Sequence, residues 1–219
     1  MKLPIVIIGS SNTSKTSVGK LLAEQLDLPF ISLADISEKY YLEIGFNQAQ
    51  QEQALEENGG DGFYRYMMPF HAYAIERVLS EHQESVIEFA PEQSVYDDFQ
   101  LLEKIEQILE SLTHVILLLY SPDTEESLQV LEESNTAIVN GMPINEHFIK
   151  HHSNHDLAEY VVYTKDRTPE QTCEDVLSKI NPSDSDIILI GPEGAGKSTI
   201  GKLLSQKLNL PQVSMDEVR

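Results

Sequence analysis

GPEGAGKS occupies residues 191–198, directly after the apolar run 187–190 and directly before a helical pattern that begins at Thr199. A glycine-rich loop between a strand and a helix directs backbone N–H groups and the positive end of the helix dipole at one point, which suits a phosphate. With this spacing Lys197 reaches the β- and γ-phosphates of a nucleotide, and the Ser198 hydroxyl ligates Mg²⁺. The stretch therefore predicts a nucleotide-binding P-loop.

The same pattern occurs once earlier in the chain. When the sequence is shifted by 182 residues against itself, GSSNTSKT at 9–16 aligns with the loop, and 12 of the 34 positions in 4–37 are identical to those in 186–219. A repeat at this distance is a repeat of whole domains, because solenoid units run about 20 to 50 residues. We predict a complete P-loop domain over 1–180 with a degenerate site, a linker over 181–185 and the N-terminal part of a second P-loop domain over 186–219.

The second unit has 37 residues after Pro182, which is room for a strand, the P-loop, a helix and the start of another strand. A unit of this size is too small to bury its own apolar face. We expect it either to continue in a longer chain or to dock on residues 1–182 or on a second copy, so self-association through 183–219 is one of the expected outcomes.

The formal net charge is −21, and residues 1–182 hold 31 Asp and Glu against 11 Lys and Arg. Such a surface repels nucleic acids and anionic membranes, so neither is expected as a partner. The single cysteine, Cys173, excludes an internal disulfide framework and is expected in the core. No signal peptide and no apolar stretch near the roughly 18 residues of a membrane span occur, so the expected location is the cytoplasm.

Apolar runs alternate with amphipathic segments along residues 1–180, which predicts an α/β fold with a parallel sheet. The expected strands are 4–8, 30–33, 85–90, 114–120 and 160–163. The expected helices are 17–26, 35–46, 47–57, 63–80, 97–112, 124–133, 144–152 and 169–180. The glycine-rich segment 58–62 predicts a turn, Pro69 is expected to start or kink a helix, and 134–142 reads as a loop.

The order of these parts resembles the shikimate kinases and the wider nucleoside-monophosphate-kinase-like group of small-molecule kinases. The resemblance rests on the P-loop, the turn at Leu28-Pro29, and the segments GFYR at 62–65, SVIEFA at 85–90, HVILLLYSPDTEESL at 114–128 and LAEYVVYTKDRTPEQTCEDVLSKI at 157–180. It implies the three-layer sandwich of a kinase-like P-loop NTPase. It also implies ATP or another nucleoside triphosphate with Mg²⁺, and transfer of a phosphoryl group to a small-molecule acceptor.

The resemblance also assigns roles to single residues. It makes Lys15 and Thr16 the phosphate and Mg²⁺ groups of the first loop and Lys197 and Ser198 their equivalents in the second. The remaining nucleotide-binding positions that it implies are Gly9, Ser14, Gly191, Gly194, Gly196, Thr199 and, in the loop 165–169 that passes the adenine, Arg167.

On the acceptor side the resemblance makes Asp216 the acid that contacts the acceptor hydroxyl. The first unit has Ala34 at this position, followed by Asp35. Arg65 lies where the family has an arginine for the acceptor carboxylate, shifted by one position; the alternative is a surface partner for one of the many carboxylates. Glu88, after a buried strand, is a candidate Mg²⁺-orienting acid or a hydrogen-bonded strand-end carboxylate.

The first unit departs from the family pattern in ways that argue against shikimate as its substrate. Ala-Pro-Glu-Gln at 90–93 stands where the family has three glycines, and Lys104 is the only Lys or Arg between Arg77 and Lys150, where a lid would supply arginines. Ser14 replaces the last glycine of the loop, and its Cβ crowds the phosphate or strains the turn by about 1–3 kcal/mol.

Two further groups of residues have more than one interpretation. His147, His151 and His155 repeat at the spacing of helical turns and are candidate metal ligands, or solvent-facing side chains of a lid helix. The second group either forms a stacking pocket for an acceptor or belongs to the core with hydroxyls at its edge. Its members are Tyr40, Tyr41, Tyr64, Tyr66 and Tyr73.

Two functional hypotheses follow. In the first, the protein is an ATP-dependent small-molecule kinase whose second unit is the intact copy, with Lys197, Asp216, Lys15 and Arg65 as the catalytic candidates. In the second, residues 1–182 form a non-catalytic, nucleotide-sensing or regulatory domain.

Overall fold

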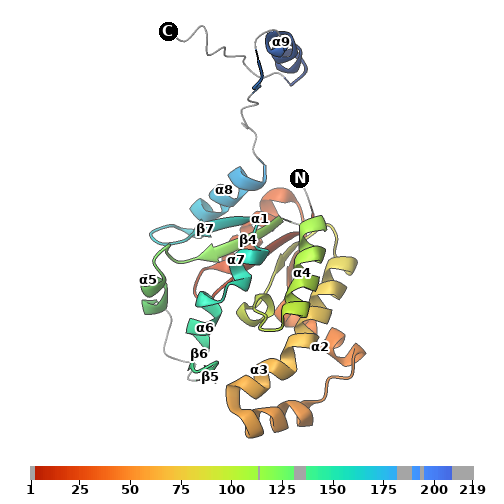
Figure 1. The fold of residues 1–219 in the computed structure, drawn as a ribbon, viewed down its shortest axis with the longest axis vertical. Helices are drawn as coiled ribbons and strands as arrows, with labels where there is room; N and C mark the ends of the chain where they lie inside the picture. Colours follow the sequence, from red (N-terminus) through yellow and green to blue (C-terminus); the bar gives the residue numbers. More distant parts are fainter. Residues whose placement is uncertain (1–2, 113, 131–136, 182–188, 193–194, 209–219) are drawn as a thin grey trace. The chain divides into compact units, whose positions relative to one another are not determined.

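The computed structural model describes residues 3–112, 114–130, 137–181, 189–192 and 195–208 (Figure 1). The chain divides into two compact units, Met1–Asn181 and Pro182–Arg219. No helix among the described residues is long and apolar enough to cross a membrane.

The first unit is built on a five-stranded parallel sheet with the order β2-β3-β1-β4-β7. The strands are β1 (Ile5–Gly9), β2 (Phe30–Ser32), β3 (Val86–Glu88), β4 (His114–Leu119) and β7 (Tyr160–Tyr163). The central strand β1 pairs with β3 on one side and with β4 on the other. This order confirms the predicted α/β fold with a parallel sheet, and it is the three-layer arrangement of a kinase-like P-loop NTPase.

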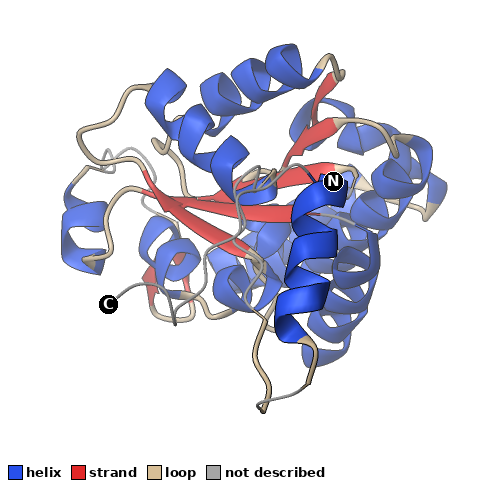
Figure 2. Cartoon of the chain, turned by 90° about the horizontal axis from the view of Figure 1, so that it is seen from above, coloured by secondary structure: helices blue, strands red, loops and turns tan. Residues whose placement is uncertain are grey.

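Helices cover both faces of the sheet, as Figure 2 shows from above. Ile5 and Ile7 of β1 pack with α1 (Lys15–Leu26) and α8 (Pro169–Ile180), and this face includes Cys173, buried as predicted. Val6 and Ile8 point to the opposite face, which α3 (Gln48–Glu81) and α4 (Phe99–Leu112) cover. Successive side chains of a strand alternate between faces, so a strand buried on both faces reads as an uninterrupted apolar run.

The longest helix, α3, spans the segment in which we predicted a turn. It follows α2 (Leu33–Glu43), and Asn47 caps its first turn by accepting from the backbone N–H groups of Ala49 and Gln50. The helix is interrupted only at Gly59, whose φ of 60° and ψ of −146° are non-helical. The predicted turn over 58–62 is thus a single-residue break, and Pro69 lies inside the helix without a break of its own.

Several boundaries between residues 89 and 163 differ from the prediction. Asp98 accepts from the N–H groups of Gln100 and Leu101, so α4 begins at Phe99, two residues later than expected. A short antiparallel pair replaces part of the expected loop over 134–142. The elements of this region are η1 (Pro91–Ser94), α5 (Thr124–Gln129), β5 (Ile138–Val139), β6 (Met142–Pro143), α6 (Ile144–Lys150) and α7 (Ser153–Leu157).

The second unit contains α9 (Lys197–Leu208), which begins at the lysine of GPEGAGKS. The strand expected over 187–190 is not present at Leu189 and Ile190, and residues 187–188 lie outside the described part of the chain. Ile190, Ile200 and Leu203 are exposed large apolar side chains.

The tyrosines belong to the core rather than to a stacking pocket. Tyr40, Tyr41 and Tyr64 are buried, and the Tyr64 hydroxyl donates to the carbonyl of Val95 at 2.7 Å. This bond connects α3 to the segment that precedes α4.

Replacing Tyr64 by Phe should lower the free energy of unfolding by about 1–3 kcal/mol, because the buried Val95 carbonyl then has no donor in water or protein. Tyr66→Phe is the matched control, since the Tyr66 hydroxyl bonds to exposed Asn47 and water can take its place. Urea denaturation of both variants measures the difference, and equal losses would contradict the assigned role of Tyr64.

Candidate functional site

The loop 9–16 lies at the carboxyl edge of the sheet, between β1 and α1. In an open parallel sheet, ligands bind at the carboxyl edge, where the connections from adjacent strands lead to opposite sides of the sheet. In this sheet that place is at β1, which lies between β3 and β4. Gly9 has a φ of 138°, and a Cβ at this position would lie 2.1 Å from the carbonyl oxygen of Leu118 in β4. Close packing of the loop against the sheet therefore requires this glycine.

Lys15 folds back over the loop at the start of α1. Its Nζ donates to the carbonyl of Ser10 at 2.8 Å, and the same carbonyl accepts from the Thr13 hydroxyl at 2.9 Å. Only 7% of Lys15 is exposed. Burial lowers the pKa of this ammonium to about 8, although the charges of Glu88 and Glu92 oppose the shift. The negative charge of a phosphate at the loop would stabilise the charged ammonium of Lys15 and so oppose this lowering of its pKa.

Thr16 and Glu88 lie together at the carboxyl edge of the sheet. The Thr16 hydroxyl contacts both carboxylate oxygens of Glu88, at 2.9 and 3.0 Å. Glu88 is the last residue of β3, whose register with β1 places it opposite Ile7. The structure thus brings the two candidate Mg²⁺ residues of the first unit into direct contact.

The residue before the lysine has the left-handed conformation in both loops. Ser14 has a φ of 58° and Gly196 a φ of 77°. The Ser14 hydroxyl makes no helix-capping bond, so nothing local offsets the strain of a Cβ in this region. Asn12 is also left-handed, with a φ of 61°, but asparagine tolerates this conformation and its side chain donates to the Val130 carbonyl.

The second loop repeats the local geometry of the first. Lys197 Nζ donates to the carbonyls of Pro192 at 2.7 Å and Gly191 at 2.8 Å, and Pro192 aligns with Ser10 of the first loop. The N–H of Ile200 donates to the Gly196 carbonyl at 3.0 Å, as Val18 does to Ser14 at 2.9 Å. Ser198 and Thr199 are exposed. Gly194 and Asp216 lie outside the described residues.

Three cations around the expected lid and adenine loop are paired with carboxylates. Arg167 binds Asp175 at 2.7 Å, Lys165 binds Glu126 at 2.7 Å, and Lys150 binds Glu146 at 2.7 Å. Each pair is partly exposed, so a stronger anion can compete for its cation. Arg167 nevertheless does not extend freely toward a nucleotide in this structure.

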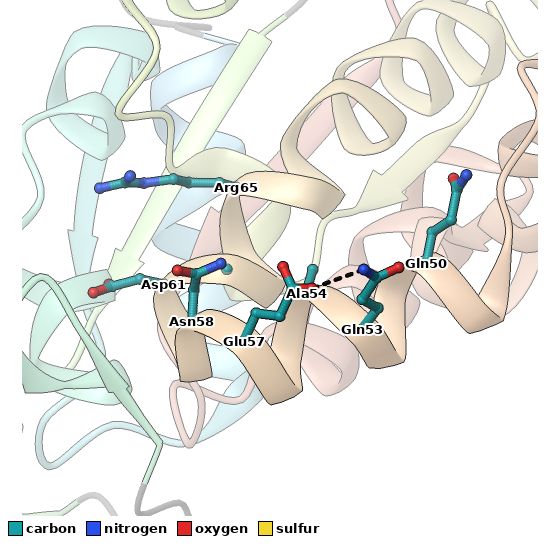
Figure 3. A pocket seen from close by; sticks show the side chains of 8 residues that line it. Gln50, Gln53, Ala54, Glu57, Asn58, Asp61 and Arg65 are labelled. Carbon is teal, nitrogen blue, oxygen red and sulfur yellow. Dashed lines mark hydrogen bonds between the residues drawn. The ribbon is translucent and has the colours of Figure 1, made fainter.

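Arg65 lines a cavity of about 470 Å³ on the N-terminal part of α3 (Figure 3). Arg65 and Asp61 project to the same side of the helix. The rest of the wall is lined by Gln50, Gln53, Ala54, Glu57, Asn58 and Gly62. No residue of the loop 9–16 lines this cavity. Asp35, the acid that follows Ala34, is exposed in the first turn of α2.

Two of the three candidate histidine ligands come together, and the third does not. α6 ends at Lys150, so His147 lies on this helix and His151 directly follows it. His155 lies on α7, where it is exposed. The three imidazoles are therefore not aligned, and the alternative of solvent-facing histidines fits His155 but not the buried His147. Asp97 completes a cluster in which one ligand atom from each residue lies within 4.8 Å of the others. Burial lowers the pKa of both His147 and His151, which favours neutral imidazoles.

Our sequence analysis missed Asp97. The neighbouring residue Asp98 caps α4, whereas Asp97 has no such local role. An acid without a local role beside a helix cap is a signal for a contact elsewhere in the fold. The sequence did not identify that contact, because the partner histidines are some 50 residues away along the chain.

Comparison with known proteins identifies the fold. No protein-family model matches the chain, and no curated protein matches it. Shikimate kinase from Aquifex aeolicus is similar in structure with a TM-score of 0.53 and 17% identity, over 84% of this chain and 100% of that one. Shikimate kinase from Acinetobacter baumannii in complex with shikimate has a TM-score of 0.53 and 18% identity, over 83% of this chain and 94% of that one. At this identity the likeness shows the kinase-like P-loop fold.

Replacing Ser14 by Gly should raise the free energy of unfolding by about 0.5–1 kcal/mol, because glycine adopts the left-handed conformation without a clash and no capping bond is lost. The expected rise in Tm is about 1–4 °C. Asn12→Gly is the control and should give no gain, since it removes the bond to Val130. A Ser14→Gly variant no more stable than the wild type would show that the loop is not strained.

Pyrophosphate binding to the first loop should weaken as pH rises through about 8, the pKa of Lys15 in the ligand-free chain. Above this pH the lysine is neutral, so each further unit of pH costs about tenfold in the lysine-dependent part of the affinity. Calorimetry on a Lys197→Ala background isolates the first loop. Adding Lys15→Gln should remove the pH dependence, and an affinity unchanged between pH 7 and 9.5 would contradict the role of Lys15.

Proposed function

We propose that this protein binds ATP or another nucleoside triphosphate with Mg²⁺ and belongs, in function, with the ATP-dependent small-molecule phosphotransferases. The observation that carries the proposal is the constellation of Lys15, Thr16 and Glu88 on a P-loop at the carboxyl edge of a parallel sheet. A buried lysine beside a helix N-terminus suits the β- and γ-phosphates, and nothing in this arrangement selects a base or an acceptor.

The donor set of Thr16 and Glu88 suits Mg²⁺, a hard cation that prefers hydroxyl, carboxylate and water oxygens. Thr16 would hold the ion, and Glu88 would orient it or one of its waters. The ion would supply positive charge to the transferred phosphoryl group. Lys15 would contribute the second positive charge, and the exclusion of water from its ammonium would strengthen that interaction.

In this proposal the second loop is the better phosphate site. Lys197 makes the same kind of bond to a loop carbonyl as Lys15, and Gly196 takes up without strain the conformation that Ser14 is forced into. A residue without Cβ also permits closer approach of the backbone to a pyrophosphate. We therefore propose that the sequence repeat also repeats the nucleotide-binding function, with Lys197 and Ser198 as the principal nucleotide contacts.

The pairing of cations with carboxylates favours a second candidate function for residues 1–182, a nucleotide-sensing or regulatory domain without turnover. Phosphoryl transfer depends on positive charge around the γ-phosphoryl, and a supplied arginine is worth about 10³–10⁵ in rate. The three cations around the expected lid and adenine loop are held by carboxylates: Arg167 by Asp175, Lys165 by Glu126 and Lys150 by Glu146. A kinase would have to break these pairs on nucleotide binding.

Lys197→Ala should weaken ATP binding in the presence of Mg²⁺ by at least about tenfold, because a charge-assisted hydrogen bond contributes about 1.5–3 kcal/mol. Lys15→Ala should have a smaller effect, because the first loop is the weaker site. Isothermal titration calorimetry on the full chain measures both. Equal binding heats for the wild type and Lys197→Ala would overturn the assignment of the second loop.

Turnover separates the two candidate functions. In the full chain carrying Lys197→Ala only the first loop remains, and the regulatory hypothesis expects no phosphoryl transfer to any small-molecule acceptor. A kcat in the ordinary range of about 1–10³ s⁻¹ with any acceptor of a substrate panel would overturn that hypothesis.

A further inference from the structure

We propose that Asp97, His147 and His151 form a binding site for a divalent transition-metal ion of the Zn²⁺ class, separate from the P-loops. Asp97 lies in the segment between η1 and α4, whereas His147 lies on α6 and His151 directly follows it. The site would join two segments that are 50 residues apart in the sequence (147 − 97). It is independent of the proposed nucleotide function.

The ligand atoms already converge. His151 Nε2 is 3.1 Å from Asp97 Oδ1, His147 Nε2 is 3.9 Å from the same oxygen, and the three ligand atoms lie within 4.8 Å of one another. Bonds of about 2.0–2.2 Å from zinc to imidazole nitrogen and carboxylate oxygen place ligands of one ion roughly 3–4 Å apart. The side chains need only small shifts to surround an ion.

The second observation is the state of His147. Only 4% of this residue is exposed, and its Nε2 is a buried nitrogen without a hydrogen-bond partner. A buried polar atom without a partner costs free energy, so such an atom requires an explanation. The rings of Tyr64 and Phe148 pack against this imidazole and hold it in place. A metal ion between Nε2 and Asp97 would provide the missing partner.

Neighbouring groups orient the carboxylate and add negative charge. The second oxygen of Asp97 accepts from Asn140 Nδ2 at 2.9 Å, and the N–H of Asn140 donates to Asp61 at 2.6 Å. Hydrogen bonds of this kind fix the ligands of metal sites and raise their affinity. Asp61 also lines the cavity beside Arg65, so Asn140 links the wall of that cavity to the cluster through its two hydrogen bonds.

His151 must change its tautomer to bind an ion. Its Nδ1 accepts from the Ser153 N–H at 3.2 Å, so in the ion-free chain the ring proton is on Nε2, facing Asp97. On ion binding through Nε2 this proton moves to Nδ1, and the long bond from Ser153 is exchanged for a metal–nitrogen bond. No net proton is lost from the neutral ring.

Two imidazoles and one carboxylate select the class of ion. Imidazole suits Zn²⁺, Co²⁺, Ni²⁺ and Fe²⁺, whereas Mg²⁺ and Ca²⁺ prefer oxygen ligands alone. Three protein ligands leave at least one position for water or a further ligand. Such an ion would fasten α6 and the β5–β6 pair, through Asn140, to the segment before α4.

The test is a titration of the metal-free full chain with Zn²⁺, followed by thermal unfolding. Free Zn²⁺ at about a hundred times its Kd should raise Tm by about 5–10 °C, while Mg²⁺ at the same concentration should not. Asp97→Asn and His151→Gln should each weaken Zn²⁺ binding by at least about a hundredfold. His155→Gln, an exposed histidine of the neighbouring helix, is the matched control and should bind like the wild type.

A second measurement avoids dependence on the folding of the variants. The Co²⁺-substituted wild type should show the visible absorption of a four- or five-coordinate ion, and X-ray absorption of the Zn²⁺ form should count two imidazoles. The proposal is overturned if the wild type shows no Tm shift, if Asp97→Asn and His151→Gln retain it, or if the spectra give an ion bound by water alone.

Discussion

Parallel pairing of β1 with β3 and β4 is the constraint on which the rest of the structure depends. Every residue of β1 is buried, so helices must cover both faces and the polar groups of the chain are confined to the ends of the strands. At the carboxyl end of β1 the chain turns sharply at Gly9 into α1, and the end of β3 presents Glu88 beside that turn. The candidate phosphate site is a direct consequence of this geometry.

Charge is the second determinant of what the first unit can do. Acidic residues far outnumber basic ones, and the cations near the expected lid each have a carboxylate partner. Lys15 differs because it is buried against loop carbonyls, where desolvation lowers its pKa and an incoming phosphate can stabilise its charge. In the function that we propose, anion binding by this unit would depend on one lysine and the loop backbone, whereas catalysis would require rearrangement of surface ion pairs.

The segment between η1 and α7 has a different organisation from the nucleotide edge. Its hydrogen bonds connect Asp97, Asn140 and His151 from three parts of the chain, and its short helices have little stability by themselves. A metal ion at this place would stabilise this segment by joining Asp97 to His147 and His151. An anion at the first loop and the proposed metal ion would then act on different parts of the first unit.

The sequence by itself determined the five strands of the sheet and the parallel α/β class of the first unit, because these depend on local periodicity. The contiguous motifs also predict two phosphate loops, whose binding of a nucleotide stays a prediction. Ser14 could even be identified as a strained position before its left-handed φ was known. The exact helix ends, the single break at Gly59, the pairing of Arg167 with Asp175 and the meeting of Asp97 with His147 were decided only by tertiary structure. The physical reason is that each of these depends on contacts with other turns or distant segments, which spacing along one helix or strand does not contain.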